Sequence, residues 1–268
     1  MKNIIKISLL GLLAIGVFSS CGKNDHKKNF IEKAFGIKME MVYVEGGEFQ
    51  MGGTAEQGSD AFIDERPIRN VKLNPYYIGK YEVTREQWIA VMYDTVVHYS
   101  KEFKDIPVFA VRWEDAQTFC EKMSLATGRT HVLPTEAQWE YAARGGIHKS
   151  NVKYAGSAIV SDVAWYGGEK YREDDIPHPV GKKKPNKLGI YDMSGNVAEW
   201  CSDIHGTYDK DDTDNPIGAS CLLCEEAARV VRGGCWSEEA ESCRVSARDL
   251  AFLGEFDGRI GFRVVVLL

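Results

Sequence analysis

The feature that most restricts the fold is a long stretch with little sign of regular structure. Residues 145–232 are rich in glycine, proline, aspartate and asparagine. Long segments without helices or strands are uncommon inside a compact domain, and their backbone polar groups need partners from elsewhere. We therefore expect few regular elements, long irregular loops, and a further feature, such as disulfides or metal ions, that holds the loops in place.

Strands are indicated outside this stretch. Residues 41–52 alternate loosely between apolar and polar side chains and break at a pair of glycines, which predicts a hairpin. Residues 74–83 predict a further strand, and residues 259–266 a final one. These strands lie near both ends of the chain, so we expect them to frame the irregular part.

Helices are indicated by their capping signals. Thr84 and Thr135 are each followed three residues later by glutamine, the order of a capping box at a helix start. Between them, apolar residues recur at helical spacing and end at Gly128, a residue typical of helix C-caps. The predicted helices cover 84–93, 114–127 and 135–144.

The N-terminus has the order of a bacterial secretory signal. Lys2 and Lys6 precede an apolar run over 7–18, which is too short to span a bilayer permanently. Cys21 follows two serines, as in a lipobox, so residues 1–20 are expected to be a lipoprotein signal peptide and Cys21 to be lipidated. The alternative is an ordinary cleaved signal with an incidental cysteine.

The composition after the signal is that of a globular protein. Residues 21–37 begin with a polar run and are interpreted as a lipidated flexible tether, which leaves 38–268 as one domain without internal repeats. The chain is 44% hydrophobic with a net charge of −6, so nothing favours nucleic acid as a partner. The predicted partners are a membrane, through the lipid, and another envelope protein.

Cysteines are numerous for an exported chain. Seven are present, and removing Cys21 leaves an even number, which suggests disulfides without fixing their connectivity. No histidine lies at zinc-finger spacing from the local cysteine clusters, which argues against a structural zinc site. The six are Cys120, Cys201, Cys221, Cys224, Cys235 and Cys243.

Two long motifs, with shorter ones in a consistent order, give a family resemblance. Residues 133–146 read Leu-Pro-Thr-Glu-Ala-Gln-Trp-Glu-Tyr-Ala-Ala-Arg-Gly-Gly, and residues 189–201 read Gly-Ile-Tyr-Asp-Met-Ser-Gly-Asn-Val-Ala-Glu-Trp-Cys. Together with Arg-Val-Val-Arg-Gly-Gly at 229–234 and Gly-Phe-Arg at 261–263, they resemble the formylglycine-generating enzyme (sulfatase-modifying factor) family. The resemblance implies an α+β, complex C-type lectin-like fold rich in irregular loops.

Family membership leaves the activity open, since one fold carries several functions. Some members oxidise a sulfatase cysteine to formylglycine with copper held by two cysteines, and some carry an iron-binding domain. Others are lipoproteins or binding modules, including components that resemble secretion or gliding machinery. This chain has no room for the iron-binding domain.

The two copper-binding cysteines of the oxidases do not both fall on cysteines of this sequence when the motifs are aligned. Counting forward from the Gly-Gly pair places the first copper cysteine of the oxidases on Glu238 and the second on Cys243. Counting back from Arg244 places the second on Ala240. Cys235 and Cys243 could still form a catalytic copper pair in a changed register; a disulfide or separate buried thiols are the alternatives.

A calcium site is also implied by the resemblance. The family's ligands correspond here to the side chains of Asp192 and Glu199 and the backbone carbonyls of Gly195 and Val197. Hard oxygen ligands on an irregular loop suit Ca²⁺. The alternative is that both carboxylates bond to backbone amides in a tight loop.

Our leading hypothesis is a lipoprotein of the cell envelope whose domain lacks the copper pair and acts as a binding or assembly component. The predicted location is the outer membrane, facing the periplasm. The alternative is a formylglycine-generating oxidase that uses copper, and a third hypothesis is a carbohydrate-related binding domain. Close sulfurs of Cys235 and Cys243 in an open groove would favour the oxidase, and burial of the two would favour binding.

Overall fold

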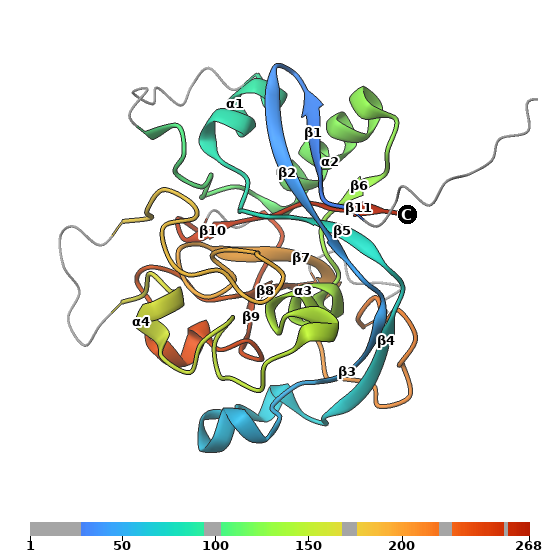
Figure 1. Cartoon of the computed structure of the whole chain (residues 1–268), viewed down its shortest axis with the longest axis vertical. Coiled ribbons are helices and arrows are strands. Elements are labelled where there is room, and N and C mark those ends of the chain that lie inside the picture. The colour runs from blue at the N-terminus through green and yellow to red at the C-terminus, as the bar shows by residue number, and fades with distance from the viewer. Residues whose placement is uncertain (1–27, 94–102, 168–175, 220–226, 255–256) are drawn as a thin grey trace, which may run out of the picture.

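The computed structural model describes residues 28–93, 103–167, 176–219, 227–254 and 257–268 (Figure 1). The predicted signal peptide and Cys21 lie outside these residues, as do Cys221 and Cys224. The elements in chain order are β1 (Phe30–Ala34), β2 (Ile37–Val44), β3 (Gly47–Met51), η1 (Ala55–Asp60), η2 (Ile63–Glu65), β4 (Arg69–Leu73), β5 (Tyr76–Gly79), α1 (Arg85–Met92), α2 (Trp113–Thr127), β6 (His131–Val132), α3 (Glu136–Ala143), η4 (Gly146–His148), α4 (Val160–Val163), β7 (Ala198–Ile204), β8 (Arg229–Arg232), η5 (Ala240–Cys243), β9 (Arg248–Ala251), β10 (Ile260–Gly261) and β11 (Val265–Leu267).

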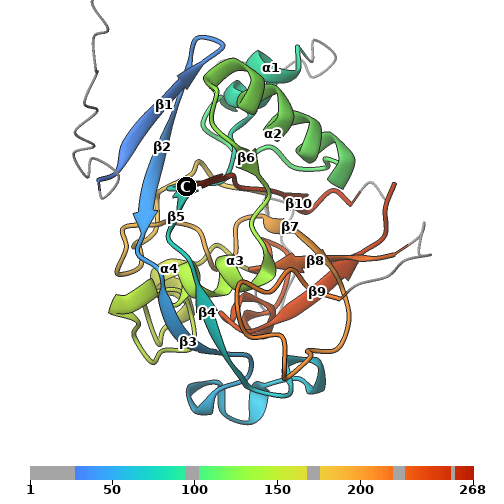
Figure 2. The ribbon, with the colours of Figure 1, turned by 90° about the vertical axis from the view of Figure 1, so that its right-hand side faces the viewer.

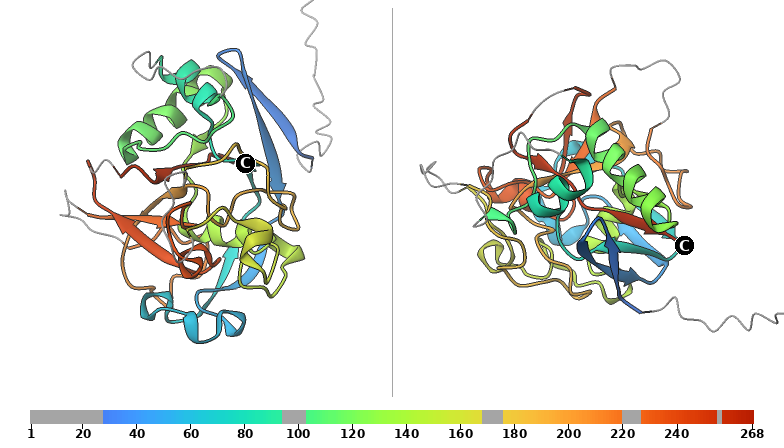
Figure 3. Two further views of the ribbon diagram at one scale, coloured as in Figure 1. Left: turned by 90° about the vertical axis from the view of Figure 1, so that its left-hand side faces the viewer. Right: turned by 90° about the horizontal axis from the view of Figure 1, so that it is seen from above.

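The strands of the described residues form three sheets. The largest has the order β1-β2-β5-β11-β6, the second β10-β7-β8-β9, and the third pairs β3 with β4. Helices α1 and α2 lie at one end of the molecule beside the β1–β2 hairpin (Figures 1 and 3). Helix α3 contacts β3 and β4 as well as β7 and β8, so it lies between the sheets (Figure 2). This mixture of sheets and short helices confirms the predicted α+β class.

The predicted hairpin over 41–52 is wrong. Strand β2 pairs with β1 and β5, whereas β3 pairs with β4. The glycine pair marks a passage between two sheets: a Cβ at Gly46 would lie 2.6 Å from the carbonyl oxygen of Leu73 and 2.8 Å from the nitrogen of Pro75. The chain therefore crosses from β2 to β3 directly beside the crossing from β4 to β5.

The helix predictions are confirmed. Thr84 and Thr135 each accept a bond from the backbone N–H three residues later, while the glutamine side chain there accepts from the threonine N–H. Gly128 closes α2 in the left-handed region with φ 73°. The apolar residues of the predicted stripe on α2 are all buried, namely Ala116, Phe119, Cys120 and Met123.

The predicted tether extends too far. Strand β1 occupies Phe30–Ala34 and pairs with β2, so these residues belong to the domain. The Phe30 ring packs edge-on against Tyr77 with centroids 4.8 Å apart, and Glu32 is buried in an ion pair with Arg129. The charges of Glu32 and Lys33 made the strand look like polar linker sequence.

The final strand predicted over 259–266 is two strands in different sheets. β10 pairs in parallel with β7, and β11 pairs with β5 and β6. Between them Arg263 is fully buried and forms a two-point ion pair with Glu199. The chain thus changes sheets around a buried arginine, which an apolar alternation pattern does not reveal.

Buried arginines, and not disulfides, hold the described loops. Cys120, Cys201, Cys235 and Cys243 are free and buried, so the expected disulfides are not formed among the described cysteines. Instead buried arginines donate to glutamates and backbone carbonyls from distant segments, as Arg244 does to Glu65 and Arg248 to Glu136 and to the carbonyls of Asp64 and Gly206. Among the residues described, no helix is long and apolar enough to cross a membrane.

Candidate functional site

A pocket opens where the resemblance implied the copper cysteines. Strand β8 ends at Arg232, and the chain turns through Gly233 and Gly234 with φ angles of 96° and 66°. Side chains are excluded here, because a Cβ at Gly233 would lie 3.1 Å from the Trp139 ring and one at Gly234 2.8 Å from the Ser242 carbonyl carbon. The pocket, about 190 Å³, is lined by Phe62, Ala198, Val231, Gly233, Gly234, Glu238, Ser242, Ala247, Arg248 and Asp249.

The two candidate catalytic cysteines do not line this pocket. Cys235 belongs to the hydrophobic cluster that contains Trp200 and Val231, whereas Cys243 packs with Tyr154 and Val163 in a separate cluster. Both side chains are fully buried. The structure therefore buries both thiols in apolar surroundings instead of exposing them in an open groove.

The chemistry of both thiols is that of buried, protonated groups. Burial, with the carboxylate of Glu238, raises the pKa of Cys235 to about 11. Burial, with Glu238 and Cys235, raises the pKa of Cys243 well above its usual value. A neutral buried thiol is a weak nucleophile, because the thiolate is the reactive form.

The polar groups of the pocket are mainly acidic. Glu238 accepts the backbone N–H of Cys235 at 3.1 Å and forms an ion pair with Arg259 at 3.3 Å. Burial and the nearby Asp249 raise the pKa of Glu238. Arg248 also lines the pocket, but its guanidinium is bound at two points by Glu136. The arrangement favours a neutral or cationic group as ligand.

The predicted calcium residues come together in one buried segment, with Asp192, Gly195 and Val197 in the loop before β7 and Glu199 at the start of that strand. Asp192 is in the left-handed region with φ 55°, and its Oδ2 accepts the N–H of Gly181 at 2.7 Å. Glu199 accepts from the indole of Trp139 at 2.8 Å and from Arg263 at 2.6 Å through each oxygen. Gly195, with φ 72°, donates its N–H to the Gly233 carbonyl.

Glu82 is a third buried carboxylate, which contacts this loop from another part of the chain and which the sequence did not indicate. Its two oxygens accept the N–H of Val197 at 3.0 Å and the side-chain amide of Asn196 at 2.7 Å. We call Glu82, Asp192 and Glu199, with Arg263, the carboxylate cluster. Glu82 follows β5, more than a hundred residues earlier in the chain, and no spacing rule connects it to the loop.

The carboxylate cluster fits a hard cation. Asp192 Oδ1 is buried without a hydrogen-bond partner among the described residues. Three carboxylates share the single guanidinium of Arg263 in this part of the described chain, and burial, with Glu199, raises the pKa of Asp192 to about 6. Burial, with Asp192 and Glu199, raises the pKa of Glu82 strongly. Such excess buried negative charge requires a proton or a cation.

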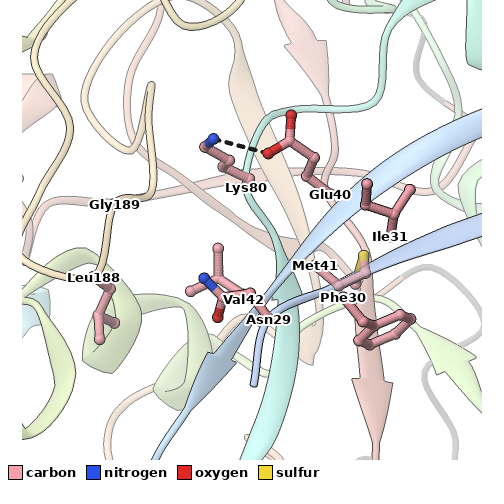
Figure 4. A pocket seen from close by; sticks show the side chains of 9 residues that line it. All are labelled: Asn29, Phe30, Ile31, Glu40, Met41, Val42, Lys80, Leu188 and Gly189. Carbon is pink, nitrogen blue, oxygen red and sulfur yellow. Dashed lines mark hydrogen bonds and ion pairs between the residues drawn. The ribbon is translucent and has the colours of Figure 1, made fainter. Parts of the chain in front are cut away.

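A second pocket lies on the opposite sheet (Figure 4). Its volume is about 260 Å³, and Lys80 forms an ion pair with Glu40 at 2.8 Å on its rim. The remaining lining is largely apolar, from Phe30, Ile31, Met41, Val42 and Leu188, with Asn29 and Gly189. It holds no cysteine or histidine, and its ionic groups are already paired.

Comparisons with known proteins agree with the motifs. The family described as sulfatase-modifying factor enzyme 1-like domain matches residues 29–268. The chain is 32% identical to chaperone protein LppX of Paenibacillus barcinonensis, over 82% of this chain and 85% of that protein. It is 28% identical to the formylglycine-generating enzyme of Streptomyces coelicolor, over 83% of this chain and 87% of the enzyme.

A solved structure has the same architecture. Treponema denticola variable protein 1 is 28% identical and superposes with a TM-score of 0.74, over 89% of this chain and 98% of that one. The alignment therefore includes nearly all of the neighbour and most of this chain.

Proposed function

The chain belongs to the sulfatase-modifying factor family, and we propose that it is a cell-envelope lipoprotein whose domain binds or assembles a partner protein without copper-dependent oxidation. The lipid would be carried by Cys21, with the domain at the outer membrane facing the periplasm. A component of a secretion or gliding machinery is the kind of partner that the family resemblance suggests.

One observation carries this proposal. The pocket next to the Gly233–Gly234 turn is lined by Glu238, Ser242 and Asp249, while Cys235 and Cys243 are absent from its lining and buried. An oxidase needs two accessible thiolates at a soft metal. A pocket with a carboxylate rim and an apolar floor instead suits a side chain from a partner.

Two further points support a protein partner in the envelope. The relative LppX is named a chaperone, and the alignment covers most of both chains. The order of Lys2, Lys6, the apolar run and Cys21 supports export and lipidation. Incorporation of labelled palmitate into the full chain, and its loss in Cys21→Ala, tests the anchor; equal labelling of both would contradict it.

We also propose that the carboxylate cluster binds Ca²⁺. Asp192 would supply its unpartnered Oδ1, with Glu199 and the carbonyls of Gly195 and Val197 completing the oxygen set. When bound, the ion would neutralise the excess negative charge of the loop. Arg263 would keep Glu199 oriented, since it already holds both oxygens of that side chain.

The decisive experiment is a Cu(I) titration of the reduced full chain in detergent, followed by incubation with a Cys-Xaa-Pro-Xaa-Arg peptide. We expect no stoichiometric copper binding and no formylglycine in the peptide. The matched control is the double variant Cys235→Ser, Cys243→Ser, which should behave like the wild type. Stoichiometric copper with formylglycine product, both lost in the double variant, would establish the oxidase instead.

A second experiment tests the pocket itself in cells. A photo-crosslinking residue at Asp249, on the pocket rim, should capture a distinct envelope protein. The same residue at Leu125, which is 87% exposed on α2, is the control surface. Identical adduct patterns from the two positions would contradict binding through the pocket.

A further inference from the structure

The segment 192–199, which carries the proposed Ca²⁺ ligands and which we call the calcium loop, is bonded directly to the lining of the pocket. Gly195 donates its N–H to the carbonyl of Gly233 at 2.8 Å, and Trp236 donates to the carbonyl of Asn196 at 2.9 Å. Ala198, two residues after Asn196, lines the pocket. The segment 233–236 therefore has its backbone positioned on both sides of Cys235 by the loop that begins at Asp192.

Asn196 is the centre of this connection. It is fully buried with φ 68°, and its side-chain amide donates to Glu82 at 2.7 Å and to the His178 carbonyl at 3.2 Å. Its backbone N–H donates to Trp165, and its side-chain oxygen accepts the N–H of His178 at 2.9 Å. A left-handed asparagine is held in that conformation by its surroundings, and here Glu82 provides a charged part of them.

We propose that Glu82 and Asn196 couple the calcium loop to the pocket, so that Ca²⁺ binding orders segment 233–236, whose first two residues line the pocket. This inference rests on the calcium site of the proposed function and goes beyond it, because it assigns the ion a regulatory effect on ligand binding. Linkage is reciprocal, so a pocket ligand would also raise the affinity for Ca²⁺.

The physical basis is the unbalanced polar groups of the carboxylate cluster. Without a cation, Asp192 keeps a buried Oδ1 with no hydrogen-bond partner among the described residues, and the Glu82 carboxylate is held by the Asn196 amide and the Val197 N–H. Movement of Glu82 releases the Asn196 amide and the Val197 N–H together, since one carboxylate holds both. Loss of those bonds loosens the loop whose Gly195 N–H and Asn196 carbonyl bond to segment 233–236, so the free energy of local opening falls there more than in the rest of the core.

Thiol labelling measures this opening without a known ligand. Cys235 lies inside the segment and is fully buried, while Cys120 is an equally buried cysteine on α2, away from the loop. The full chain in detergent is treated with a thiol reagent in saturating Ca²⁺ or in EGTA, and each cysteine is quantified by mass spectrometry. We expect Ca²⁺ to slow labelling of Cys235 about ten-fold and that of Cys120 less than about two-fold.

Glu82→Gln tests the connection. Glutamine has one side-chain oxygen, so it can satisfy the Val197 N–H or the Asn196 amide but not both. The variant should lose the selective protection of Cys235 by Ca²⁺. The matched control is Glu32→Gln, a similarly buried glutamate on β1 that contacts Arg129, and it should keep the protection.

The outcomes separate this inference from the calcium site on which it rests. Absence of Ca²⁺ binding in the wild type, measured by calorimetry, would refute the calcium site and with it this coupling. Ca²⁺ binding with equal protection of Cys235 and Cys120 would refute the coupling alone. Selective protection that persists in Glu82→Gln would show that Glu82 and Asn196 are not the connection.

Discussion

Two buried ionic groups in this molecule differ in their balance of charge. We call the first the arginine cluster: Arg144, Arg232 and Arg248 with Glu56, Glu136 and Glu140. In it each guanidinium is paired and three carboxylates meet three arginines. In the carboxylate cluster, three carboxylates share Arg263, and Asp192 keeps an oxygen without a partner among the described residues.

The difference separates a structural role from a binding role. A buried charge network is tolerated when its charges are paired, and the arginine cluster meets that condition while it fastens α3 to β8 and β9, with only Arg232 Nε lacking a hydrogen-bond partner among its described atoms. The carboxylate cluster contains the same residue types and is similarly buried, but the described side chains do not balance its negative charge. The incomplete group is therefore the one where a ligand is expected.

The largest predicted effect comes from unbalancing the arginine cluster. Glu140 binds Arg144, Arg232 and the N–H of Gly52, and Glu140→Gln would leave two buried guanidiniums short of one negative charge. We expect a loss of about 3–5 kcal/mol in the free energy of unfolding. Urea denaturation measures it, and a loss below about 1 kcal/mol would contradict the structural role. The loss should be the same with Ca²⁺ or EGTA.

The second largest predicted effect is a pH dependence of the unfolding free energy caused by Asp203, a buried carboxylate beside the arginine cluster. Burial, with the charge of Glu136, raises the pKa of Asp203 to about 7. The unfolded chain releases this proton near pH 4, so the folded state holds an extra proton between about pH 4 and 7. Stability from this group is therefore present at low pH and lost as the pH rises through that window.

Asp203→Asn removes this titration. Between pH 4.5 and 7.5 the wild type should lose roughly 3 kcal/mol of unfolding free energy relative to the variant. The difference between the two urea curves isolates Asp203 from the other carboxylates. Parallel pH profiles for the two proteins would mean that Asp203 is ionised throughout.

Replacing an acidic residue by its amide should have the opposite effect on stability in the carboxylate cluster and in the arginine cluster. Ca²⁺ at a hundred times its dissociation constant should stabilise the wild type by about 2.7 kcal/mol, seen as a higher melting temperature than in EGTA. Asp192→Asn should abolish this increment. In EGTA the variant should be at least as stable as the wild type, because it removes an uncompensated buried charge. A marked loss of stability in EGTA would show that Asp192 is structural.

The sequence predicted the features that depend on residues close together in the chain. Capping boxes at Thr84 and Thr135 gave the helix starts, and the loop 189–201 gave Asp192 and Glu199 through the family resemblance. It did not reveal contacts across the chain. Glu82 joins the calcium loop from after β5, and Arg263 replaces the expected continuous strand. Strand β1 was missed because its charged Glu32 is buried by Arg129, a partner almost a hundred residues away.

The smallest predicted effect concerns an ion pair that belongs to neither cluster. Lys80 and Glu40 form an ion pair at 2.8 Å on the rim of the pocket in Figure 4, with side chains 27% and 51% exposed. Water and salt screen such a pair, so Lys80→Gln should change the unfolding free energy by less than about 1 kcal/mol. Lys80 also lies over the rings of Tyr81 and Tyr191, and their contact with its side chain partly survives in glutamine.

The salt dependence makes this test sharp. Urea denaturation of Lys80→Gln and the wild type at 0.05 M and 1 M salt should give a difference that shrinks as the salt rises, since exposed charges are screened. Glu140→Gln measured beside it should keep its full loss at both salt concentrations, because its partners are buried. If Lys80→Gln lost as much unfolding free energy as Glu140→Gln, the contribution of an ion pair here would depend on the balance of charge and not on burial.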